Sequence, residues 1–474
     1  MTNGAFRIAF VLILLVACGP TLVWRGQSPD RRRSIEILER DGQYVVADRV
    51  RGRTYDAIGL GALTFSADSR RLAYAARRAG QWRVVVDGEE GPAYAGIGEL
   101  LFSADGRRVA YAAERGGNWL IVADSIEGPP FDEVLAHTLQ FSRDGKRFAY
   151  AAVRGDQTHV VVDGVEGPGM DGAGKLAFSE DGARIAYFAR RGQAAIAIVD
   201  GVAGPPYETI SELVLGRRGA RVGYLGKRAG SWHAVIDGVE SDPWDLVAGL
   251  AFSSDGAHVA YAARKTQGDT ALVLDGIRGR SYLGIRPASI VFGAERAAPT
   301  FIALRTDGYV VVHDDVEGPA FTEIRFPVLA ATGPRWAYAA QRGEVWFPVI
   351  DGVVQGPERW AGDPTISADG RRIAFVVRRG ADMVVLAGGM AHRYDLVLDG
   401  TLVFDPSGRH WGCVAGVRAQ RKFYIVVDGV RRAQIDVNDA INAAIHTRAS
   451  GDSVAANDDL LRGWVAAEVA KVKR

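Results

Sequence analysis

The chain has 474 residues, 48% of them hydrophobic and 24% charged, with 57 basic side chains against 56 acidic ones. This composition excludes a disordered tail, a collagen-like rod and a multi-span membrane protein. The net charge of +1 removes the overall positive field that would attract nucleic acid, so we expect no nucleic-acid partner. A chain of this length usually divides into domains unless repeats share one continuous core.

The first residues combine one cation, Arg7, with the apolar run Ile8 to Val16, which is the layout of a secretory signal. The next residues, Leu15-Val16-Ala17-Cys18, resemble the lipobox of bacterial lipoproteins, whose cysteine is lipidated and becomes the mature N-terminus. The resemblance implies a signal peptide over 1–17, lipidation of Cys18, a tether over 18–33, and a place in the bacterial envelope. Gly19 resembles the outer-membrane sorting pattern. The alternative is an uncleaved span over Ile8 to Trp24, which is short and broken by Gly19-Pro20.

From residue 34 to 446 the sequence repeats, as FSADGRRVAYAA from Phe102 and FSRDGKRFAYAA from Phe141 illustrate. The first anchor, Phe or an aliphatic residue, recurs every 37 to 40 residues, at Phe65, Phe102, Phe141, Phe178, Leu215, Phe252, Phe292, Leu329, Ile366 and Phe404. The second anchor is the Asp that closes VVVDG, at Asp48, Asp87, Asp124, Asp163, Asp200, Asp237, Asp275, Asp314, Asp351 and Asp428, with Ala387 in the same slot. Eleven repeats are present.

Each repeat has a β pattern. The segment after SxDG alternates, and VVV is a β-branched run; both are short and bounded by turns that contain Gly. Asp-Gly suits a tight hairpin in which both central residues take positive φ. The Pro of EGP is tolerated only on an edge strand, so the fourth strand is the outermost. We therefore expect four antiparallel strands, A to D, in every repeat.

Aromatic residues recur at set offsets from the two anchors, for example Tyr74 and Tyr111 nine residues after the first anchor, and Tyr55 and Tyr94 seven residues after the second. Such a stripe is typical of packing between neighbouring sheets and not of a ligand cage. Cys413 occupies one of these slots, so we expect a core side chain and not a nucleophile. The only other cysteine is Cys18, so after lipidation no disulfide is available.

Repeats of about 38 residues with four strands and FSxDGxxxAY resemble the WD40-like PD40 propeller repeats of the TolB family and of tricorn protease propellers. The resemblance covers roughly Ser34 to Val437 and implies an all-β propeller, in one ring or two. It says nothing of the ligand. TolB has a further N-terminal domain, so a role in the Tol system is not carried over.

The ends of the array predict how it closes. The first repeat, from Ser34 to Ile58, has segments that fit strands B, C and D but none that fits A. The segment AINAAIHT (440–447) has the offset of a strand A, so we expect it to complete the first sheet. The domain boundaries are then 34–446 for the propeller and 447–474 for a linker and helix, in which Leu460, Trp464 and Val465 have helical spacing.

Catalytic signatures are absent from the sequence: there is no GxSxG, HExxH, Walker loop or CxxC. We therefore predict no catalytic, cofactor or metal residues.

Nearly every B–C connection has an arginine, which is more than the fold itself requires. In a propeller these hairpins emerge on one face, and Arg is enriched at interfaces. The candidate binding face comprises Arg77, Arg78, Arg115, Arg154, Arg190, Arg191, Arg228, Arg264, Arg378 and Arg379. Solubility and mutual screening are the alternative explanation.

These observations predict a non-enzymatic, lipid-anchored propeller that serves as a binding or assembly platform at the bacterial envelope. Its partner would be an envelope protein or an anionic glycan, and its contact with the membrane would be the lipid anchor. The alternative is a propeller hydrolase or lyase that acts on envelope or extracellular polysaccharide. The uniform loop lengths favour the scaffold, since active sites usually interrupt repeats with long insertions.

Overall fold

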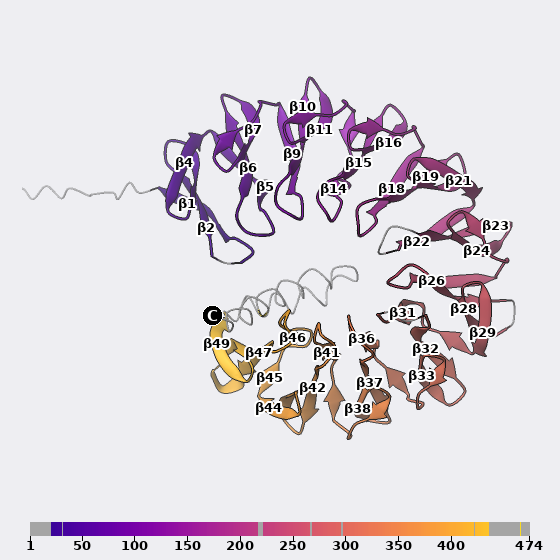
Figure 1. Cartoon of the computed structure of the whole chain (residues 1–474). Coiled ribbons are helices and arrows are strands. Elements are labelled where there is room, and N and C mark those ends of the chain that lie inside the picture. The colour runs from indigo at the N-terminus through magenta and orange to yellow at the C-terminus, as the bar shows by residue number, and fades with distance from the viewer. Residues whose placement is uncertain are drawn as a thin grey trace, which may run out of the picture. The chain divides into compact units, whose positions relative to one another are not determined.

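The computed structural model describes residues 20–30, 32–216, 221–265, 268–294, 297–420, 422–435 and 465. These residues form eleven antiparallel sheets and two short 3₁₀ helices, η1 (Pro287–Ser289) and η2 (Arg418–Gln420). The chain divides into two compact units, 1–132 with sheets 1 to 3 and 133–474 with sheets 4 to 11, and each is described by itself (Figure 1). The predicted all-β fold of four-stranded propeller repeats is confirmed.

The strands of the first unit are, in sheet 1, β1 (Thr21–Gln27), β2 (Ser34–Glu39), β3 (Gln43–Ala47) and β4 (Val50–Tyr55); in sheet 2, β5 (Ala57–Phe65), β6 (Leu72–Arg78), β7 (Gln81–Val86) and β8 (Glu89–Glu90); in sheet 3, β9 (Gly96–Phe102), β10 (Val109–Arg115), β11 (Asn118–Ala123) and β12 (Ile126–Glu127).

The strands of the second unit are, in sheet 4, β13 (Glu133–Val134), β14 (Gln140–Phe141), β15 (Phe148–Arg154), β16 (Gln157–Val162) and β17 (Val165–Glu166); in sheet 5, β18 (Gly172–Phe178), β19 (Ile185–Arg191), β20 (Ala194–Val199) and β21 (Val202–Tyr207); in sheet 6, β22 (Thr209–Leu215), β23 (Val222–Arg228), β24 (Ser231–Ile236) and β25 (Val239–Glu240); in sheet 7, β26 (Leu246–Phe252), β27 (Val259–Arg264), β28 (Thr270–Leu274) and β29 (Ile277–Tyr282). They continue, in sheet 8, with β30 (Gly284–Ile285), β31 (Val291–Phe292), β32 (Pro299–Arg305), β33 (Gly308–His313) and β34 (Val316–Glu317); in sheet 9, with β35 (Glu323–Ile324), β36 (Val328–Leu329), β37 (Trp336–Arg342), β38 (Val345–Ile350) and β39 (Val353–Val354); in sheet 10, with β40 (Trp360–Ala361), β41 (Thr365–Ile366), β42 (Ile373–Arg379), β43 (Asp382–Ala387) and β44 (Met390–Tyr394); in sheet 11, with β45 (Leu396–Val397), β46 (Val403–Phe404), β47 (Trp411–Val417), β48 (Lys422–Val427) and β49 (Val430–Ile435).

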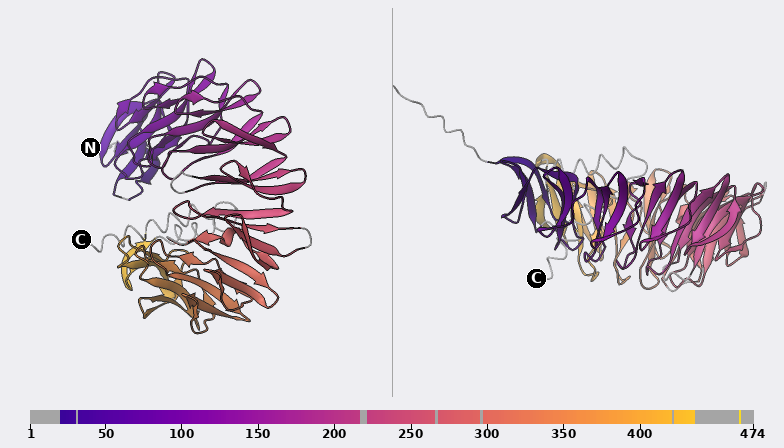
Figure 2. Two further views of the ribbon diagram at one scale, coloured as in Figure 1. Left: turned by 45° about the vertical axis from the view of Figure 1, so that its right-hand side comes forward. Right: turned by 90° about the horizontal axis from the view of Figure 1, so that it is seen from above.

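Every sheet is a simple meander in the order A, B, C, D, so strand D is an outer edge, as predicted. In five sheets strand A is broken into two segments that both pair with strand B. We call the edge that holds the B–C hairpin and the start of strand A the B–C edge, and the opposite one, with the A–B and C–D hairpins, the C–D edge. Within each unit the strands of neighbouring sheets run side by side (Figure 2).

The C–D hairpins turn as the Asp-Gly pairs predict. Asp87 and Gly88 have φ values of 53° and 89°, and Asp163 and Gly164 have 52° and 82°. The A–B turns are held by the Ser-x-Asp side chains, also as predicted. Ser66 Oγ donates to Asp68 Oδ1 at 2.6 Å, and the amide of Arg71 donates to Ser66 Oγ at 2.9 Å.

The prediction that sheet 1 lacks its own strand A is wrong. β1 lies within residues 18–33, the segment predicted to be a tether, and pairs antiparallel with β2 from Thr21↔Glu39 to Gln27↔Ser34. The segment AINAAIHT lies outside the described residues, but the place proposed for it is occupied by β1. The array therefore begins with a complete sheet that uses residues close to Cys18.

The core lies between the faces of consecutive sheets. Tyr55 of sheet 1 meets Tyr74 of sheet 2 edge to face, with ring centroids 6.3 Å apart, and Tyr207 meets Tyr224 in the same way at 5.9 Å. The aromatic slots thus pack sheet against sheet, as predicted. Cys413 is fully buried in this core, and burial raises the pKa of its thiol to about 12, as expected for a core side chain and not a nucleophile.

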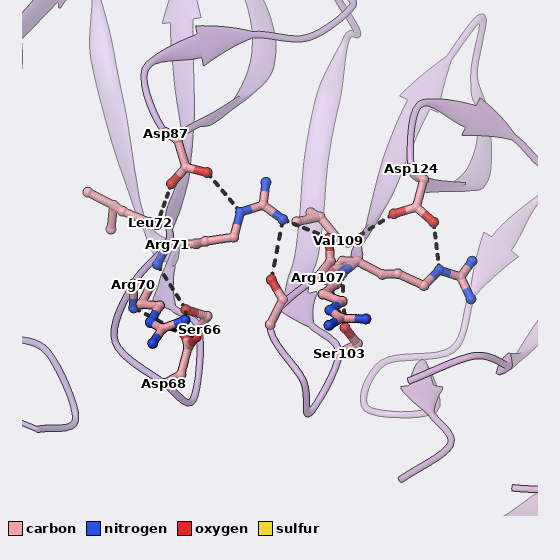
Figure 3. Close-up of polar contacts among 12 residues, drawn as sticks. Ser66, Asp68, Arg70, Arg71, Leu72, Asp87, Ser103, Arg107, Val109 and Asp124 are labelled. Atoms are coloured by element: carbon pink, nitrogen blue, oxygen red, sulfur yellow. Dashed lines mark hydrogen bonds and ion pairs between the residues drawn. The ribbon is translucent and has the colours of Figure 1, made fainter. Parts of the chain in front are cut away.

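Arginines at the C–D edge join consecutive sheets. Arg71 Nε donates to Asp87 Oδ2 at 2.8 Å within sheet 2, and Arg71 Nη1 donates to the carbonyl oxygen of Arg107 in sheet 3 at 2.7 Å (Figure 3). The amide of Leu72 donates to the other Asp87 oxygen. The same Arg–Asp pair occurs at Arg33–Asp48, Arg108–Asp124, Arg147–Asp163, Arg184–Asp200, Arg221–Asp237 and Arg335–Asp351.

Of the predicted C-terminal helix only Val465 is described, and the rest of 447–474 lies outside the described residues. Val465 is helical and fully buried, in one apolar cluster with Val414, Ile425 and Val427 of sheet 11. Within the described part of the chain, no helix has the length and apolar character that crossing a membrane requires.

Candidate functional site

Half of the predicted binding face is occupied by contacts inside the protein. Five of its arginines reach from the end of strand B to a glutamate, in the pairs Arg78–Glu90, Arg115–Glu127, Arg154–Glu166, Arg228–Glu240 and Arg379–Glu358. In the first four pairs the acid is the Glu of strand D, and in the fifth it occupies the aromatic slot. These arginines are therefore each paired with an acid of the protein itself, while their side chains stay 40% to 50% exposed.

Three of these arginines, Arg78, Arg115 and Arg228, pack on a tyrosine of the sheet before their own. The guanidinium of Arg115 in sheet 3 lies 4.8 Å from the ring centre of Tyr94 in sheet 2, while the Tyr94 hydroxyl donates to Glu127 at 2.8 Å. The ion pairs of these three arginines are thus also joints between two sheets.

Glu90 is the most heavily bonded of these acids. Its side chain is 10% exposed and lies within 3.2 Å of guanidinium nitrogens of Arg53, Arg78 and Arg83, and it accepts the Tyr55 hydroxyl at 3.0 Å. Burial by itself would raise its pKa, but the hydrogen bonds from Arg83, Tyr55 and Arg53 outweigh that effect and lower it.

The other members of the predicted face have different surroundings. Arg77 stacks on Trp82 at 5.7 Å, and Arg191 lies 3.7 Å from the Met170 sulfur. Arg190, Arg264 and Arg378 are exposed at the B–C edges of their sheets. The use of this face by a partner stays a prediction.

Sequence reasoning missed a second set of polar residues on strand A. In the second unit, each sheet has one position, three to six residues before the strand A anchor, where strand A bulges or breaks. We call these positions the strand A row: His137, Lys175, Glu212, Gly249, Arg286, Arg325, Asp363 and Asp399.

The backbone along this row is unusual. His137, Lys175 and Glu212 have φ values of 60°, 51° and 52°, a region that residues other than glycine seldom adopt. A bulge of this kind inserts an extra residue and turns its side chain away from the normal alternation of the strand. Such strain is common at functional sites.

Members of the row bond to the next sheet along the chain. Glu212 accepts the amides of Gly249 and Leu250 at 2.8 and 2.9 Å. Arg286 donates to Glu323 at 2.9 Å and to the carbonyl oxygen of Ile324 at 2.7 Å. The row therefore connects the A strands of neighbouring sheets.

The densest part of the row surrounds Arg325. One of its nitrogens lies 3.3 Å from an Asp363 oxygen and 3.7 Å from an Asp399 oxygen. The guanidinium also lies 5.3 Å from the ring centres of both Trp346 and Trp360. The Asp363 and Asp399 side chains are 60% and 50% exposed, so two carboxylates face solvent beside a cation that contacts two indole rings.

This group can recognise a polar or charged ligand through its carboxylates, with Arg325 held rigidly by its aromatic neighbours. Aligning the repeats by their anchors could have revealed the strand A row from the sequence. At this slot the chain has an acid, a base, a histidine or a glycine, whereas the packing slots are mostly aromatic or aliphatic. In the described residues, no three or more His, Cys, Asp or Glu are grouped to hold a metal ion.

No family model matches the chain, and no curated protein matches it. Solved structures that match include the crystal structure of the eukaryotic initiation factor, with 11% identity over 84% of this chain and 92% of that chain, at a TM-score of 0.34. The crystal structure of TolB from Acinetobacter baumannii has 15% identity over 46% of this chain and 62% of that chain, with a TM-score of 0.23. The β-propeller domain of the Trilobed protease from Pyrococcus furiosus has 13% identity over 55% of this chain and 95% of that chain, with a TM-score of 0.24. At these scores no functional argument follows from the likeness.

Proposed function

We propose that the protein is a non-enzymatic binding platform of the bacterial envelope, anchored by lipid on Cys18, whose partner contacts the strand A row around Arg325. The observation that supports it is the contrast between slots. Packing positions are mostly aromatic or aliphatic in every sheet, whereas the strand A row changes between positive, negative and uncharged side chains along the second unit. Side chains that served only to join sheets would have no reason to differ in this way.

The chemistry of the row suits an envelope protein with a basic segment. Asp363 and Asp399 are half exposed, and both carboxylates lie within 3.7 Å of one nitrogen of Arg325. An anionic glycan would instead meet the exposed cations Arg190, Arg264 and Arg378 at the B–C edges. The two partner classes therefore predict different contact residues.

A photo-cross-linking amino acid tests this contact. Placed at position 326 in cells, where Phe326 is 52% exposed next to Arg325, it should give an adduct of defined mass while both carboxylates stay in place. A matched control is position 353 on β39, where Val353 is 62% exposed at the C–D edge. Identical adducts from 353 and 326, or none from 326, would contradict the proposal. Adducts from positions 190 and 378 alone would favour the arginine face.

The anchor is tested separately. Cells grown with an alkyne palmitate analogue should label the wild-type chain and should not label Cys18→Ala, because Cys413 is fully buried and offers no reactive thiol. Equal labelling of the wild type and Cys18→Ala would remove the anchor from the proposal.

The alternative, a hydrolase or lyase acting on polysaccharide, would require paired carboxylates, and Asp363 with Asp399 is the pair that the row brings together. If the purified chain cleaves envelope polysaccharide and the double variant Asp363→Asn/Asp399→Asn does not, the alternative replaces the platform.

A further inference from the structure

The first sheet begins almost immediately after the proposed lipid site. Only Gly19 and Pro20 separate Cys18 from Thr21, the first residue of β1. Three residue steps span at most about 10 Å, even when fully extended. If Cys18 is acylated, as proposed above, no flexible tether exists, and the start of β1 must lie close to the bilayer surface.

The pairing of β1 shows at which edge of sheet 1 this strand begins. Thr21 pairs with Glu39, the last residue of β2, and the B–C hairpin with Arg40 follows directly. At the far end Gln27 pairs with Ser34, near the C–D hairpin that places Ala47 opposite Val50. The six residues of β2 separate the two edges by roughly 17 to 20 Å. The lipid would therefore emerge at the B–C edge.

The side chains at this edge suit a bilayer surface. Leu22 and Val23 are 48% and 37% exposed, and Val23 lies at a bulge that takes it out of the pairing with β2. Arg40 is exposed beside them. Glu39 and Asp41 are also at this edge, so attraction to anionic lipid cannot supply the affinity; the acyl chains would, and the apolar side chains would seat the edge.

We infer that the B–C edge of sheet 1, with Leu22, Val23 and Arg40, rests on the bilayer that holds the acylated Cys18. This inference depends on the proposed anchor and adds to it an orientation. The C–D edge of the same sheet, with its exposed Val50, faces away from the membrane. Acylated lipoproteins usually need a flexible linker to reach partners at a distance, and here the first sheet is itself the membrane contact.

Fluorescent labels on single introduced cysteines test the orientation. Leu22→Cys, Arg40→Cys and, as the matched control, Val50→Cys would each be labelled in the acylated full-length chain. Cys413 is fully buried and its thiol pKa is raised to about 12, so it should not take the label. The chains are then bound to phosphatidylethanolamine and phosphatidylglycerol vesicles that contain a spin-labelled lipid quencher. Labels at 22 and 40 should be quenched severalfold more than the label at 50.

Failure of the anchor and failure of the orientation give different results. If the chain does not float with the vesicles, or Cys18→Ala floats equally well, the anchor is wrong and the inference falls with it. If the wild type floats through Cys18 but positions 22, 40 and 50 are quenched equally, or 50 more strongly, the anchor stands and the membrane contact of this edge is overturned.

Discussion

Deleting residues 436–474 should destabilise sheet 11 and make the protein associate with itself. Sheet 11 is the last sheet that the described residues form. Val414 and Val427 on the outer face of β47 and β48 are fully buried, and Ile425 is 2% exposed. They belong to one cluster with Val465, so Val465 supplies part of their cover. Repeat arrays need such a cap because an uncovered terminal face is apolar.

A point variant isolates this contact. Val465→Ala should cost about 2 kcal/mol, and Val465→Asp should cost more, since it places a charge at a position with no exposed area. Val430→Asp is the matched control, because Val430 lies in the same sheet and is 53% exposed. Hydrogen exchange of the β47 and β48 amides should speed up in Val465→Asp, and light scattering should show association. If Val465→Asp behaves like Val430→Asp, the tail is not the cap.

The outer faces of sheets 1 and 11 differ in polarity. In sheet 1, the strand B positions that would face a preceding sheet are Ser34, Glu36 and Leu38, none of them buried, and Glu36 pairs with Arg25 at 2.6 Å. The buried side chain opposite them is Tyr44, which pairs with Leu38 and is 4% exposed. The equivalent strand B and C positions of sheet 11 are apolar, and Val465 packs against them.

The sheets were predictable because their signals are local. Asp-Gly dictates the hairpin, Ser-x-Asp dictates the A–B turn, and both recur in a pattern that places every strand between them. β1 was missed although its signal is present: Ser28-Pro29-Asp30 forms the same turn, with Ser28 Oγ donating to Asp30 at 2.6 Å. The anchor before that turn is Gln27 instead of Phe, so the repeat pattern did not extend to it.

The arginine face was only partly predictable because its contacts are not local. Arg115 meets a glutamate two strands away in its own sheet and a tyrosine in the sheet before it. The sequence indicates that a cation ends strand B, but not that its side chain turns back along the seam between sheets. The strand A row was missed for a related reason, because bulges change which way a side chain points and leave no simple periodicity.

Glu90→Gln should weaken the joint between sheets 1 and 2 by about 3 kcal/mol, because removing one partner of a buried ion pair leaves the other charges uncompensated. Glu90 is 10% exposed, and three guanidiniums and a tyrosine hydroxyl converge on it. Arg53 and Arg78 are 59% and 40% exposed and would be hydrated again in the variant. The loss of free energy should therefore be near the lower end of the range for broken buried ion pairs. Glu89→Gln is the matched control, since Glu89 is the exposed neighbour on the same strand.

Hydrogen exchange of the β4 and β8 amides measures this loss locally, which suits an array whose sheets need not unfold together. A loss of about 3 kcal/mol corresponds to exchange roughly a hundredfold faster. Glu90→Gln amides that exchange no faster than those of Glu89→Gln would show that the joint does not depend on this carboxylate.

The same joint should depend on pH with a definite sign. The folded-state pKa of Glu90 is lowered, so its ionised form stabilises the folded chain above the unfolded glutamate pKa of about 4.3. That contribution is lost as the pH falls from there through the lower folded-state value. The difference in exchange rate between wild type and Glu90→Gln should therefore be constant from about pH 5 upward and shrink below about pH 4. A difference that persists unchanged at pH 3 would mean that Glu90→Gln acts through packing and not through charge.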